Sequence, residues 1–224
     1  MKLPGVAFVS LVFVVCGCSD GEGPEPGSGE VPSGLLDVEG AAEDAYDKAL
    51  AGDHAAVVAA AATIDASWRG VRSELATDGA AGGDLTAMDT AVRDLASAAA
   101  SSTDPTTVAR AANAISAPMD ELFAIYAPTV PVDVLALDYL GREVVLDGMA
   151  APASATGHID TIQATWIRVK PALLAAGGQR EATDYEATIS GLRAAATGHD
   201  GAAMIAQAKV GLEIVDAIES VFAP

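Results

Sequence analysis

Apolar residues recur with helical spacing through most of the chain after about residue 35. Ile64, Trp68, Val71 and Leu75 lie at positions i, i+4, i+7 and i+11, which places them on one face of an α-helix. Turn dipeptides such as Asp78-Gly79 and prolines interrupt this pattern. We therefore predict helices at 38–51, 54–77, 84–101, 105–127, 132–150, 154–176, 180–197 and 201–222.

The apolar pattern repeats itself in the second half of the chain. The motif Thr-Ile-x-Ala-Ser/Thr-Trp-x-x-Val-Arg/Lys-x-x-Leu begins at Thr63 and again at Thr161, and it contains both tryptophans of the sequence. The segments 120–128 and 216–224 also match each other. The offsets are 98 and 96 residues, and two small loop deletions account for the difference. Self-similarity at a nearly constant offset is typical of a duplicated unit. We predict an all-α fold of two homologous four-helix units, 35–128 and 129–224, forming either one pseudo-twofold bundle or two bundles.

Alanine-rich helices approach one another closely, but each alanine buries little area. The predicted core therefore depends on a few large side chains. We expect the structural core to include Trp68, Trp166, Tyr126 and Phe222, together with Leu122, Ile125 and Ile218. Pro171 lies inside a predicted helix, where it either kinks that helix or begins its second half.

Composition excludes some classes of protein. The chain has 224 residues, of which 51% are hydrophobic, so it has enough apolar surface to fold. Its net charge of -19, from 12 basic and 31 acidic side chains, argues against nucleic acid as a partner. Aromatic residues make up only 4%, which disfavours a β-sandwich or barrel. An acidic surface of this kind also keeps a protein soluble, so it does not by itself indicate a cationic ligand.

The N-terminus has the features of an export signal. Lys2 precedes an apolar run from Gly5 to Val15, which is too short to span a bilayer and is typical of a secretory signal peptide. An ordinary cleaved signal or an uncleaved anchor are the alternatives. Residues 18–34 are rich in Gly, Pro and acidic side chains, and we interpret them as a flexible tether.

The end of this segment, Val15-Cys16-Gly17-Cys18, resembles the lipobox of bacterial lipoproteins. The resemblance implies that residues 1–17 are removed and that Cys18 carries the lipid, such as palmitate, which anchors the chain to a membrane. Ser19 follows the cysteine, which by analogy favours the outer membrane, on its periplasmic or its surface face. Both cysteines lie in this segment, so the mature domain would hold no disulfide and no cysteine nucleophile.

Motifs for catalysis are missing: the sequence has no phosphate-binding glycine loop, nucleophile elbow or His-Glu-x-x-His. We therefore predict a protein that is not an enzyme and has no resident cofactor. A less favoured alternative is a hydrolase whose active site has no recognisable sequence motif. The histidines, His54, His158 and His199, do not align across the repeat. We interpret them as exposed turn or cap residues; the alternative is that one or two of them bind a metal together with carboxylates.

Two acidic groups are candidate sites. Glu39, Glu43 and Asp47 share one helical face, which is either a solvated surface or a ligand set for a hard cation. Asp138 and Glu143, together with Tyr139 and Arg142, form the most polar part of an apolar segment, and polar groups on a buried helix need partners. Asp138 and Arg142 are spaced for an intrahelical ion pair. The possible metal ligands are therefore Asp138, Glu143, Glu39, Glu43 and Asp47.

These observations favour a lipid-anchored cell-envelope protein that acts as a non-enzymatic binding or interaction module. Its partners would be the membrane, through the lipid, and an unidentified protein or small ligand at the seam between the units. The alternative is a metal-handling protein in iron or copper uptake. The duplicated helical layout is similar to that of imelysin-type periplasmic proteins, although their His-x-x-Glu motif is missing from this chain.

Overall fold

The computed structural model describes residues 30–222, and within this range the chain is all-α, with no strand. The predicted signal peptide, Cys18 and most of the tether lie outside the described residues. The order of helices along the chain is α1 (Ser33–Leu50), α2 (His54–Thr77), α3 (Gly82–Ser101), α4 (Pro105–Asn113), α5 (Met119–Ala124), α6 (Val132–Ala150), a short 3₁₀ turn η1 (Pro152–Ser154), α7 (Ala155–Ala175), α8 (Gln179–Thr197) and α9 (Gly201–Phe222).

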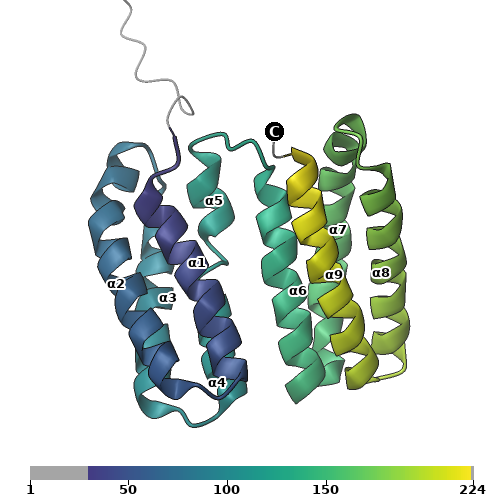
Figure 1. The fold of residues 1–224 in the computed structure, drawn as a ribbon, viewed down its shortest axis with the longest axis horizontal. Helices are drawn as coiled ribbons and strands as arrows, with labels where there is room; N and C mark the ends of the chain where they lie inside the picture. The colour runs from purple at the N-terminus through teal and green to yellow at the C-terminus, as the bar shows by residue number, and fades with distance from the viewer. Residues whose placement is uncertain (1–29, 223–224) are drawn as a thin grey trace, which may run out of the picture.

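The helices form two groups that lie side by side (Figure 1). In the first group α1 packs against α2 and α4, and α3 packs against α2 and α4. In the second group α6 packs against α7 and α9, and α8 packs against the same two helices. Helix α6 also contacts α4 and α5, so it joins the two groups. The homology of the two halves stays a sequence prediction.

Each group has its own buried apolar cluster. Trp68 in α2 is 3% exposed, and Trp166 in α7 is 1% exposed and packs against Tyr185 with ring centroids 4.8 Å apart. Tyr126 is buried in the first cluster. Phe222 is only partly buried, which differs from the expectation for a core residue, because it lies in the last turn of α9 at the edge of the second cluster.

The predicted helix at 105–127 is wrong in one respect: it is two helices, α4 and α5, separated by a turn at 114–118. Pro118 explains the break, since it has no N–H to donate to Ala114 and its ring clashes with that carbonyl. Pro171, by contrast, lies inside a continuous α7. Because Pro171 has no N–H, the backbone carbonyl of Ile167, four residues earlier, has no helical hydrogen-bond donor. Both residues are exposed, so water can donate to that carbonyl instead. The first helix begins at Ser33, slightly inside the predicted tether.

No helix within residues 30–222 combines the length and the apolar character that a membrane span requires.

Candidate functional site

Helix α6 carries polar side chains on two of its sides, and each side forms its own network with another helix. Asp138 and Arg142 face α1, whereas Glu143 and Asp147 meet side chains of α4 and α7. Residues 138 and 143 are five positions apart, which at about 100° per residue separates their side chains around the helix. The metal ligands predicted from the sequence are therefore divided between two places.

Arg142 is the centre of the first network. Its Nη2 lies 2.9 Å from Glu43 Oε1 and 2.9 Å from Asp138 Oδ2, so the expected Asp138–Arg142 ion pair is present. The guanidinium also lies 5.5 Å from the ring centroid of Tyr46, within cation–π range. The side chains of Arg142 and Asp138 are only 13% and 15% exposed. This network therefore joins α1 of the first group to α6 through the largely buried Arg142 and through Glu43, whose side chain is 44% exposed.

Acidic groups outnumber the single arginine in this region. Burial, followed by the nearby charge of Glu43, raises the pKa of Glu39 to about 7. Burial, followed by the charge of Asp138, raises the pKa of Glu219 to about 7. Burial likewise raises the pKa of Asp138 to about 6, although Arg142 opposes the shift. These carboxyl groups therefore change charge close to neutral pH.

A pocket of about 680 Å³ opens beside this network, between the two helix groups. We call it the seam pocket. Four glutamates line it, Glu30, Glu39, Glu43 and Glu219, and they come from the residues before α1, from α1 and from α9. The other lining residues are mainly apolar and come from α1, α5, α6 and the connection between α5 and α6; they include Leu36, Phe123, Val130 and Leu135. The pocket therefore combines negative charge with apolar surface.

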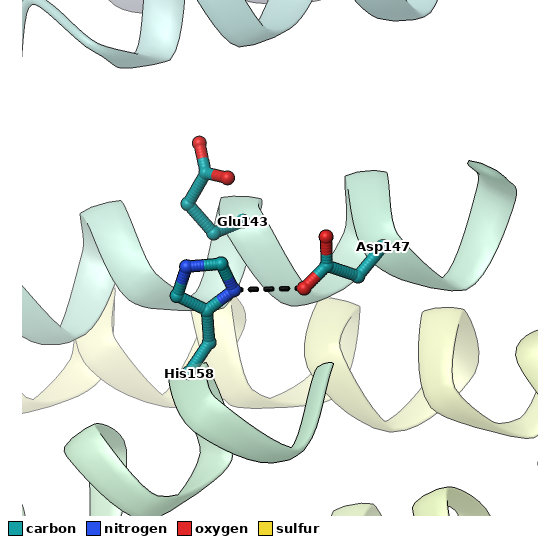
Figure 2. Close-up of side chains that lie close together, drawn as sticks. All are labelled: Glu143, Asp147 and His158. Carbon is teal, nitrogen blue, oxygen red and sulfur yellow. Dashed lines mark hydrogen bonds and ion pairs between the residues drawn. The ribbon is translucent and has the colours of Figure 1, made fainter. Parts of the chain in front are cut away.

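The second network lies on the side of α6 that meets α4 and α7. Arg110 of α4 donates hydrogen bonds to Glu143 and, at 2.9 Å, to Asp147. Asn113 Nδ2 donates to Glu143 Oε1 at 2.9 Å, and His158 Nδ1 lies 2.7 Å from Asp147 Oδ2. Figure 2 shows Glu143 and Asp147 projecting from α6 with the His158 ring beside them. Both carboxylates are buried, at 5% and 4% side-chain exposure.

Within residues 30–222, one cluster has metal-ligand geometry, namely Glu143, Asp147 and His158. Each residue offers one ligand atom, and these atoms lie within 4.8 Å of one another. Of the sequence candidates, only Glu143 belongs to it. Glu39, Glu43 and Asp138 gather near Arg142, and Asp47 is exposed on α1.

Sequence reasoning missed Asp147 and the role of His158. His54 and His199 are exposed, as expected, but His158 is only partly exposed and pairs with Asp147. A usable signal was present, since Glu143 and Asp147 are spaced i, i+4 in a segment that is otherwise apolar. The position of His158 depends on the packing of α7 against α6, which local spacing does not reveal.

Comparison with known proteins gives no assignment: no family of known proteins, no curated protein and no solved structure matches the chain.

Proposed function

We propose that this chain is a lipid-anchored, non-enzymatic binding module of the bacterial cell envelope, and that its ligand is an organic cation with apolar groups, bound in the seam pocket. The observation that carries the proposal is the lining of the pocket, in which four glutamates meet apolar side chains from both helix groups. Its volume lies within the range of about 300–1,000 Å³ that is typical of small-molecule sites.

Charge supports a cation rather than an anion as the ligand. Arg142 already pairs with Glu43 and Asp138, which leaves Glu39 and Glu219 with raised pKa values near neutrality. A bound cation replaces protons on these carboxyl groups and stabilises their ionised form. An anion would meet an excess of negative charge at the same place, because Arg142 is already paired with two carboxylates. The apolar lining favours a ligand that also buries hydrocarbon or aromatic surface.

The first test uses rhodamine 6G, a fluorescent aromatic cation, and residues 19–224 without lipid. This part contains both buried clusters, which lie between Leu35 and Ile218. We expect fluorescence anisotropy to show saturable binding that strengthens by about tenfold from pH 6 to pH 8, because ionisation of Glu39 and Glu219 favours a cation. The anionic dye fluorescein should not bind.

Matched variants locate the binding. Glu39→Gln and Glu219→Gln should each weaken rhodamine 6G binding by about tenfold and reduce its pH dependence, since each removes one ionisable carboxyl. Glu213→Gln, at an exposed position on the same helix α9, is the control and should bind like the unmodified chain. Equal binding by all these variants, or equal binding of fluorescein, would refute a cation site in the seam pocket.

The membrane anchor has a separate test. Cells fed an alkyne-labelled palmitate should incorporate the label into the chain, because the proposed lipid is attached at Cys18. Cys18→Ser should lose the label almost completely, whereas Cys16→Ser, two residues away in the same leader, should retain it. Retention of the label by the Cys18 variant, or no label in either variant, would contradict the lipoprotein proposal without affecting the seam pocket.

A further inference from the structure

We propose that Glu143, Asp147 and His158 form a binding site for a divalent transition-metal ion such as Zn²⁺, and that the guanidinium of Arg110 competes with the ion for the two carboxylates. This site is distinct from the seam pocket and does not depend on the proposed function.

The geometry of the three side chains fits an ion. They offer two carboxylate oxygens and one imidazole nitrogen, all within 4.8 Å of one another, so small side-chain rotations bring them to ligand distance. Two of them project from α6 and one from α7, helices that pack directly against each other (Figure 2). His158 is 32% exposed at its side chain, which leaves the site a path to solvent.

The charge balance also favours a dication. Two buried carboxylates carry two negative charges, and Arg110 supplies one positive charge. Buried charges in proteins are normally paired or bound to metals, because unpaired charge is costly to remove from water. An ion of charge +2 would neutralise both carboxylates at once, with a ring nitrogen of His158 as its third ligand.

Arg110 has somewhere to move when an ion enters. Its side chain is 40% exposed, and it lines a hollow of about 610 Å³ at the surface of α4. Asp94 and Asp104 line the same hollow, so acidic partners for the displaced guanidinium are already close. Metal binding would therefore break the ion pairs that Arg110 of α4 makes with α6, and would form metal–ligand bonds to α6 and α7 instead. The ion would weaken one of the contacts between the helix groups.

The donor set selects the class of ion. Ca²⁺ prefers six to eight oxygen ligands, whereas imidazole nitrogen combined with carboxylate oxygen suits Zn²⁺, Mn²⁺ or Fe²⁺. We therefore expect Zn²⁺ to bind and Ca²⁺ not to compete with it.

Titration calorimetry with ZnCl₂ on residues 19–224 tests the site. We expect one Zn²⁺ per chain, and Arg110→Gln should tighten binding by about tenfold or more, because the competing positive charge of the guanidinium is gone. Arg72→Gln is the matched control: the side chain of Arg72 is as exposed as that of Arg110, at 42% against 40%, and pairs with Asp89, far along the chain from the site. This variant should leave zinc affinity unchanged. Asp147→Asn and His158→Gln should each weaken binding by about tenfold or more.

Removal of a ligand, as in Asp147→Asn or His158→Gln, could weaken zinc binding simply by disturbing the fold. Arg110→Gln avoids this ambiguity, because it retains all three ligands and is expected to bind zinc more tightly. An increase in zinc affinity for Arg110→Gln, absent in Arg72→Gln, supports the site. An Arg110 variant that binds zinc no more tightly than the unmodified chain, or a folded His158 variant of unchanged affinity, overturns it. Rhodamine 6G binding tests the seam pocket, whereas zinc titration tests the site at Glu143, Asp147 and His158. Either proposal can therefore fail without affecting the test of the other.

Discussion

Arg142 shows how a single side chain organises the region between the helix groups. A buried guanidinium is costly to desolvate, and here it is stabilised by two carboxylates and the face of Tyr46. Burial still dominates for the neighbouring Asp138, whose pKa rises to about 6 despite the arginine. Low dielectric and excess negative charge thus favour the uptake of positive charge, either as protons or as a ligand.

Trp166 allows a residue-scale test of the core. It is 1% exposed and packs on Tyr185, so Trp166→Ala should lower the free energy of unfolding by about 3–5 kcal/mol. Chemical denaturation monitored by circular dichroism measures the change. The adjacent Ile167 is 64% exposed, and Ile167→Ala should change stability by less than about 0.5 kcal/mol. Similar losses for the two variants would show that Trp166 does not act as a core residue.

At the scale of helices, the sequence predicted most elements because their signals are local. Asp53 and Asp104 accept hydrogen bonds from backbone N–H groups at the starts of α2 and α4, as N-cap residues do. The i, i+4, i+7 spacing around Trp68 marked the buried face of α2 correctly. The exception was the helix containing Pro118, where apolar spacing continued across a break that the proline ring imposes.

The sites were less predictable because they combine residues from helices that are distant along the chain. The Asp138–Arg142 pair lies within one helix, and its spacing was sufficient to predict it. Glu143, however, pairs with Arg110 and Asn113, which are 33 and 30 positions earlier. Which residues meet there depends on how α4 and α7 pack around α6, and helical periodicity contains no information about that packing.

At the scale of the whole molecule, α6 belongs to both helix groups. Its residues Val144 and Val145 are buried in the second apolar cluster, whereas Leu146 is buried in the first. Val132 and Leu135 also pack partly buried against the first cluster. The boundary at residue 129 therefore separates two sets of helices but not two complete cores.

This sharing predicts unequal stability of the two halves when they are expressed separately. The second half, 129–224, contains every residue of its own buried cluster and should unfold cooperatively in urea. The first half, 30–128, loses Leu146 and the carboxylate partners of Arg110, so it should be less stable by about 2–5 kcal/mol than in the intact chain. A first half as stable as the intact chain would show that α6 adds nothing to its core. A second half that fails to fold would show that the two groups form one cooperative unit.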